Sequence, residues 1–95
     1  MSDLSVVVPA HNAGAYLKAA VGSILAERLP GLEIVVVDDG STDGSVAAVE
    51  RLSVRVVHQK KSGEAAARNA GVRASSGSLV SFLDADDLIA PGGLA

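Results

Sequence analysis

Residues 33–43 read EIVVVDDGSTD, and within this stretch a continuous apolar run turns abruptly into acidic and small polar residues. The segment from Leu32 to Val37 is apolar without alternation after Glu33, which is typical of a strand whose two faces are both covered by helices. The Asp-Asp-Gly-Ser sequence that follows has the composition of a turn and of a helix N-terminus. This stretch therefore predicts a buried strand that delivers Asp38 and Asp39 to one edge of a sheet.

The segment before this strand predicts a first strand and a helix. The apolar, β-branched run from Leu4 to Val8, ended by Pro9, predicts the strand. Residues 13–28 carry apolar side chains at the spacing of one helix face, which predicts an amphipathic helix between the two strands. Tyr16 is expected to be a packing residue on a face of that helix.

The segment after residue 43 continues the alternation of helix and strand. The same reasoning predicts a short helix, a strand, a helix and a final strand over residues 44–52, 54–58, 62–74 and 78–83. Val46 and Val49 are expected to form the inner face of the short helix. The inner stripe of the next helix is expected to be made of small residues, namely Ala67, Ala70, Gly71 and Ala74. Together, these elements predict a doubly wound, mainly parallel α/β sheet with helices on both faces.

Composition excludes several functional classes. The 95 residues contain no cysteine, which excludes disulfides and thiolate metal sites. Aromatic residues make up 2% and the net charge is -3, so no nucleic-acid partner is expected. The acidic N-terminus and the short first apolar run do not resemble a secretory signal. We expect a location in the cytoplasm, with the cytoplasmic face of a membrane as a second location.

Short stretches that contain polar residues lie at the ends of three of the predicted strands, and the carboxyl ends of parallel strands are where ligands bind in open α/β sheets. They are Pro9, Ala10, His11 and Asn12 after the first strand, Asp38 and Asp39 after the second, and Asp84, Asp86 and Asp87 after the fourth. Clustered carboxylates repel one another unless a cation lies among them. Oxygen ligands without cysteine favour Mg²⁺ or Mn²⁺, so the sequence predicts a divalent metal at this edge.

Four stretches of the chain carry a resemblance to a known family. They read VVVPAHNAGAYLKAAVGSIL, EIVVVDDGSTDGS, GEAAARNAGVRASSG and VSFLDADD. In this order and spacing they resemble family 2 glycosyltransferases, which have the GT-A fold. The resemblance covers residues 1–95, which look like the N-terminal, nucleotide-sugar-binding part of a longer, truncated catalytic domain.

The resemblance implies an activity and its cofactor. Members of the family transfer a sugar from a nucleotide-diphosphate donor, and a UDP-sugar and inversion are expected here. The implied cofactor is Mn²⁺ or Mg²⁺, and the acceptor is an unknown saccharide, lipid carrier or other molecule. The catalytic base of the family lies in the later half of the domain, so the 95-residue chain alone is expected to be inactive in transfer.

The resemblance also implies roles for single residues. Asp39 resembles the carboxylate that accepts a hydrogen bond from the base, and Arg68 resembles an arginine near the nucleotide. Asp84 and Asp86 stand as the D-x-D pair, and Asp86 and Asp87 are the expected metal ligands. The stretch expected to lie along the base and ribose consists of Pro9, Ala10, His11 and Asn12.

Two other readings stay open from the sequence. One is a non-catalytic fragment or assembly module of the same fold. The other is a Mg²⁺-dependent phosphoryl-transfer domain, which also places aspartates at strand ends. The apolar strand over residues 78–83 predicts an exposed sheet edge, through which a homodimer is expected. Lys60 and Lys61 are expected to be a solvated pair of loop charges.

Overall fold

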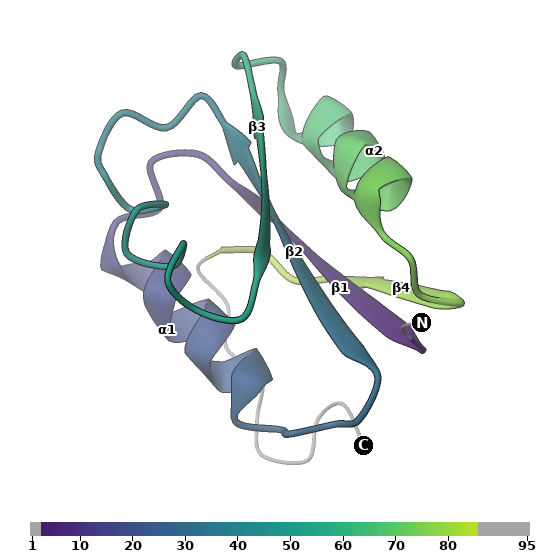
Figure 1. The fold of residues 1–95 in the computed structure, drawn as a ribbon. Coiled ribbons are helices and arrows are strands. Elements are labelled where there is room, and N and C mark those ends of the chain that lie inside the picture. Colours follow the sequence, from purple (N-terminus) through teal and green to yellow (C-terminus); the bar gives the residue numbers. More distant parts are fainter. Residues whose placement is uncertain (1–2, 86–95) are drawn as a thin grey trace.

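The computed structural model describes residues 3–85 and contains a four-stranded sheet in the order β3-β2-β1-β4 (Figure 1). All three strand pairs are parallel, which confirms the predicted fold class. The strands are β1 (Leu4–Ala10), β2 (Leu32–Asp39), β3 (Arg55–Gln59) and β4 (Leu79–Phe82). The helices are α1 (Ala15–Leu25) and α2 (Glu64–Ala74).

The two central strands are buried on both faces, as the apolar residues 6–8 and 34–37 predict. Side chains of β1 and β2 alternate between two cores, because successive residues of a strand point to opposite faces. Val8 and Val36 belong to the larger core with α1, whereas Val7 and Val35 belong to the core with α2. Figure 1 shows the two helices on opposite sides of the sheet.

The small inner stripe of α2 lets this helix approach the sheet closely, as predicted. Ala67 is 1% exposed and packs in the core beneath the helix. A Cβ atom on Gly71 would collide with Cγ1 of Val7 and would lie 3.2 Å from Cγ2 of Val37. The close contact therefore depends on glycine at position 71.

The prediction that Pro9 ends the first strand is wrong, because β1 continues through Pro9 to Ala10. The carbonyl of Val7 accepts a hydrogen bond from Leu83. The backbone groups of every second residue, among them Pro9, therefore point to the side of β1 on which β4 lies. The pairing of β1 with β4 stops at Val7. A backbone N–H at Pro9 would point past the end of that pairing, so its absence removes no ladder bond.

The predicted short helix over residues 44–52 is also wrong. This segment forms successive turns, in which Val49 N donates to the Val46 carbonyl and Leu52 N donates to the Val49 carbonyl. This i to i+3 spacing is tighter than that of an α-helix. Val46 and Val49 are nevertheless buried, at 5% and 0% exposure, so the prediction of an inner face is confirmed.

The first helix is shorter than predicted, and the side chain of Tyr16, in its first turn, does not pack against the rest of the protein as expected. The helix begins after Gly14, which has a φ of 59°, and the chain reaches a φ of 51° at Arg28. Tyr16 is 66% exposed, which makes the expectation of a packing residue wrong.

The strand β4 forms one edge of the sheet and presents apolar side chains to solvent. Leu79, Val80 and Phe82 are 69%, 37% and 45% exposed. The expected homodimer through this edge stays a prediction. Within residues 3–85, neither helix has the length and apolar character needed to cross a membrane.

The fit of α2 against the sheet predicts opposite effects of two glycine substitutions. Gly71→Ala forces a methyl group against Val7 and is expected to lower the free energy of unfolding by about 1–3 kcal/mol. Gly22→Ala is the matched control, because its Cβ would meet nothing within 4 Å, and it is expected to add about 0.5–1 kcal/mol. Urea denaturation measures both, and equal effects of the two variants would contradict the close packing of α2.

Candidate functional site

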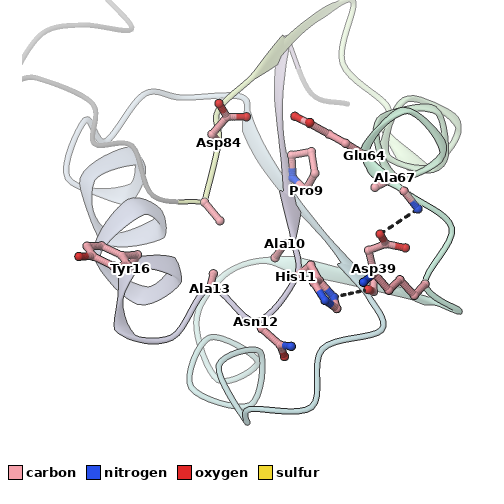
Figure 2. A pocket seen from close by; sticks show the side chains of 13 residues that line it. Pro9, Ala10, His11, Asn12, Ala13, Tyr16, Asp39, Glu64, Ala67 and Asp84 are labelled. Atoms are coloured by element: carbon pink, nitrogen blue, oxygen red, sulfur yellow. Dashed lines mark hydrogen bonds between the residues drawn. The ribbon is translucent and has the colours of Figure 1, made fainter.

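An open cavity of about 530 Å³ lies where β1 and β2 end and α2 begins (Figure 2). Its volume lies within the range of small-molecule sites. It is lined by Pro9, Ala10, His11, Asn12, Ala13, Tyr16, Asp39, Lys61, Gly63, Glu64, Ala67, Asp84 and Ala85. The structure therefore brings together six residues singled out from the sequence, namely Pro9, Ala10, His11, Asn12, Asp39 and Asp84.

Asp39 is buried and accepts three hydrogen bonds. Its Oδ1 accepts from Gln59 Nε2 at 2.9 Å and from Ser62 N at 2.7 Å, and its Oδ2 accepts from Gly63 N at 3.1 Å. Gly63 directly precedes α2, so a carboxylate from β2 lies at the positive end of this helix. Asp39 thus joins β2, the end of β3 and the start of α2.

These contacts lower the pKa of Asp39 below its ordinary value of 3.8. The hydrogen bond from Gln59 is the largest cause, burial opposes it, and the N–H groups of Ser62 and Gly63 and the charge of His11 add to the lowering. A carboxylate offers about four acceptor positions, so one position on Asp39 is left for a ligand.

The loop after β1 is fastened to the loop after β2. His11 Nδ1 lies 2.8 Å from the Asp39 carbonyl, and since a carbonyl only accepts, Nδ1 carries the proton. Asn12 N donates to Ser41 Oγ at 3.0 Å, and Asn12 Oδ1 accepts from Thr42 N at 2.7 Å. Asn12 has a φ of 48°, a conformation that asparagine tolerates better than most residues. These bonds fix the wall of the cavity before any ligand binds.

Two other carboxylates of the Asp-Asp-Gly-Ser-Thr-Asp stretch close turns and do not line the cavity. Asp38 accepts from Ser41 N at 2.8 Å and from His58 Nδ1 at 3.0 Å. Burial alone would raise the pKa of Asp38, but the hydrogen bonds from Ser41 and His58 outweigh it and lower the pKa. Asp43 accepts from Gly14 N at 2.9 Å, which holds the start of α1.

Arg68 lies beside the cavity without lining it. Its guanidinium is 2.7 Å from the carboxylate of Glu64 and 3.8 Å from that of Asp84, and both of these residues line the cavity. It also lies 5.8 Å from the centre of the Phe82 ring. All three charged side chains are about half exposed, so the pairs contribute little stability and mainly orient the two carboxylates.

The expected metal ligands Asp86 and Asp87 lie outside the described residues. Within residues 3–85, no group of three or more histidine, aspartate or glutamate side chains could hold a metal ion. Asp84 lines the cavity with a partly exposed carboxylate. Mg²⁺ and Mn²⁺ are usually held by one or two carboxylates together with waters and phosphate oxygens, so Asp84 fits as one member of such a set.

The sequence-based selection missed several residues of the cavity, among them Tyr16, Lys61 and Glu64. The exposure of Lys60 and Lys61 agrees with the expected solvated pair of loop charges, but the place of Lys61 in the cavity wall was not expected. The topology could have indicated these residues. The loop that joins the end of a strand to the next helix begins at the same edge of the sheet as the other strand ends. Glu64 opens the helix that follows β3, so the same rule applies to it.

The hydrogen bonds that Asp39 accepts predict that replacing its carboxylate lowers the free energy of unfolding by an amount that depends on pH. Asp39→Asn is expected to lower the free energy of unfolding at about pH 7 by roughly 2 kcal/mol, because its amide N–H then faces the N–H of Gly63 and the ionised acceptor is lost. The folded-state pKa of Asp39 is lowered, so its contribution is complete above the ordinary value of 3.8 and is lost as the pH falls through the lowered value.

Urea denaturation of wild type and Asp39→Asn at about pH 7 and about pH 2.5 measures this cost. The difference is expected to shrink at the lower pH. Asp3→Asn, at an exposed position away from the cavity, is the control and is expected to change neither value. A difference that is constant with pH would show that the ionised carboxylate does not stabilise this edge.

Comparisons with known proteins agree with this geometry. Residues 5–95 match the pattern described as Glycosyl transferase family 2. The uncharacterized glycosyltransferase YibD of Escherichia coli (strain K12) is 38% identical in an alignment 95 positions long, which covers 95% of this chain and 28% of that protein.

Two solved structures share the fold. That of S. aureus TarS residues 1–349 in complex with UDP-GlcNAc has a TM-score of 0.89 at 32% identity, over 97% of this chain and 29% of that one. That of the mannosyltransferase PcManGT from Pyrobaculum calidifontis in complex with GDP-Man and Mn²⁺ has a TM-score of 0.83 at 34% identity, over 90% of this chain and 28% of that one.

This chain spans less than a third of the length of each of these relatives. The match nevertheless includes nearly every residue of the chain, and the solved relatives have the same parallel sheet fold. The chain belongs to glycosyl transferase family 2 and has the GT-A fold.

Proposed function

We propose that the cavity binds the nucleoside diphosphate part of a sugar donor, and that residues 1–95 are the nucleotide-sugar-binding part of a glycosyltransferase. One observation carries this proposal. Four separate segments, namely the end of β1, the end of β2, the start of α2 and the residues after β4, line the same cavity. Family membership gives this cavity its chemical meaning, since TarS and PcManGT are seen with nucleotide sugars.

The base is proposed to lie at the end of the cavity formed by Asp39 and His11 (Figure 2). Asp39 has one acceptor position left and is ionised at neutral pH, so it suits a base that offers a ring N–H. TarS is seen with UDP-GlcNAc and PcManGT with GDP-Man, and the bases of both donors carry such a group. A UDP-sugar is the donor we propose for this chain, with Pro9, Ala10 and Asn12 along the base and ribose.

The diphosphate is proposed to lie toward Asp84 with a divalent metal. Asp39, Glu64 and Asp84 make the cavity acidic, and a diphosphate is anionic, so a cation is required between them. Asp86 and Asp87 are the proposed ligands of Mn²⁺ or Mg²⁺, with Asp84 beside them. The metal would stabilise the negative charge that develops on the departing diphosphate.

Arg68 is proposed to remain close to the nucleotide. In the structure, its guanidinium lies 2.7 Å from the carboxylate of Glu64 and 3.8 Å from that of Asp84, which places a positive charge beside two residues that line the cavity. Its pairs with Glu64 and Asp84 hold these carboxylates in place while the donor binds.

Inverting transfer to a saccharide, a lipid carrier or another acceptor is the proposed activity of the complete protein. Inversion requires a base that removes the proton of the acceptor hydroxyl. We infer that this catalytic base, which is a residue of the protein and not the nucleotide base, lies outside residues 1–95. This chain is therefore expected to bind the donor without transferring the sugar. The cytoplasmic location and the homodimer through β4 stay predictions.

Calorimetric titration with UDP tests the proposal. Wild type is expected to bind UDP at least about tenfold more tightly with Mn²⁺ than without it, because the metal offsets the repulsion between carboxylates and diphosphate. Asp86→Ala is expected to abolish this metal dependence. Asp3→Ala, which removes a carboxylate away from the cavity, is the matched control and is expected to retain it.

Two results would contradict the proposal. The first is the absence of UDP, GDP or TDP binding by folded wild type, which would support the non-catalytic module instead. The second is equal binding of UDP with and without metal in both wild type and Asp86→Ala. Binding of an acyl phosphate analogue at Asp39 or Asp84 would support phosphoryl transfer.

A further inference from the structure

We propose that Lys61 determines which nucleotide bases the cavity accepts. The Lys61 ammonium donates a hydrogen bond to a carbonyl of the base, and this carbonyl lies next to the ring N–H that donates to Asp39. This inference rests on the proposed function and adds to it the class of base. Lys61 lines the cavity together with Asp39, although the two residues come from different segments.

The backbone on both sides of Lys61 is held against Asp39. Ser62 N donates to Asp39 Oδ1 at 2.7 Å, and this nitrogen belongs to the peptide bond between Lys61 and Ser62. Ser62 Oγ donates to the Lys60 carbonyl at 2.7 Å, which closes a tight turn around Lys61.

Gly40 also fixes this position. It has a φ of 73°, and a Cβ atom there would lie 3.0 Å from the backbone N of Lys61. The backbone of Lys61 is therefore pressed against the residue that follows Asp39, and a side chain at position 40 would push it away.

The ammonium of Lys61 is available to a ligand. Two of the carboxylates that line the cavity, those of Glu64 and Asp84, pair with Arg68. None of the ion pairs found between residues 3 and 85 includes Lys61. A lysine ammonium has only donors and reaches far along a flexible stem, so it suits a carbonyl oxygen on the ligand.

Asp39 as an acceptor beside Lys61 as a donor is complementary to a base edge that carries a donor beside an acceptor. Uracil, thymine and guanine each present a ring N–H next to a carbonyl oxygen. On the side of its amino group, cytosine presents the reverse pattern, with a ring nitrogen that accepts next to an amino group that donates, whereas its other neighbouring group is a carbonyl as in uracil. With Lys61 on the side of the amino group, cytosine would place acceptor against acceptor at Asp39 and donor against donor at Lys61, which leaves these groups without hydrogen-bond partners.

Isothermal titration of UDP and CDP in the presence of Mg²⁺ tests this inference on the 95-residue chain. Lys61→Met removes the donor and keeps the stem, and it is expected to lower the affinity for UDP by about tenfold while leaving that for CDP unchanged. Lys60→Met is the matched control, since the neighbouring lysine does not line the cavity, and it is expected to leave both affinities unchanged. Lys61→Arg, which keeps a cationic donor, is expected to retain most of the preference for UDP.

The possible outcomes are distinct. A UDP-to-CDP affinity ratio that falls about tenfold in Lys61→Met alone supports the inference. Equal losses for UDP and CDP would show that Lys61 acts on the diphosphate, and no loss would show that it does not touch the ligand. Either result overturns this inference and leaves the proposed function intact. Failure of wild type to bind either nucleotide overturns the proposed function and the inference with it, and thermal unfolding of each variant confirms that the chain is folded.

Discussion

The carboxylate of Asp39 is the contact on which the geometry of the cavity depends. It accepts hydrogen bonds from Gln59 at the end of β3 and from Ser62 and Gly63 at the start of α2, while its own backbone ends β2. The Asp39 carbonyl meanwhile accepts from His11, which follows β1. Three strand ends and one helix start therefore converge on a single residue. Any ligand that binds Asp39 meets an arrangement that is already formed.

The aspartates at this edge divide into two groups with different tasks. Asp38 and Asp43 use their oxygens to close turns, and hydrogen bonds lower the pKa of both, so both stay ionised. Asp39 and Asp84 face the cavity together with Glu64. Because the net charge of the chain is already -3, an anionic ligand needs cationic help at this edge. A divalent metal is the source that we propose.

The strand and helix pattern was predictable wherever local sequence dominates. The unbroken apolar run of β2 and the small stripe around Gly71 each predict their burial correctly. The errors occur where tertiary pairing decides. Pro9 stays in its strand because β4 has already ended beside it, and residues 44–52 bury two valines without forming an α-helix.

The site was predictable in its position and only partly in its members. Residues that follow strands could be expected at one edge from topology alone. The hydrogen bonds from Ser62 N and Gly63 N to Asp39 join residues 23 and 24 positions apart, and no local pattern encodes that pairing. Lys61 was missed for the same reason, since its place depends on the loop being drawn against Asp39 and Gly40.

The central claim is that the ligand is held at the carboxyl edge of the sheet around Asp39. Titration of the ¹⁵N-labelled chain with UDP and Mg²⁺, followed by amide chemical shifts, tests it most directly. The account predicts that the largest shifts occur at His11, Asn12, Ser62 and Gly63, while Ser5 and Gly77, hydrogen-bonded to each other far from the cavity, stay unchanged. Shifts that centre on Ser5 and Gly77, with those around Asp39 unmoved, would contradict it.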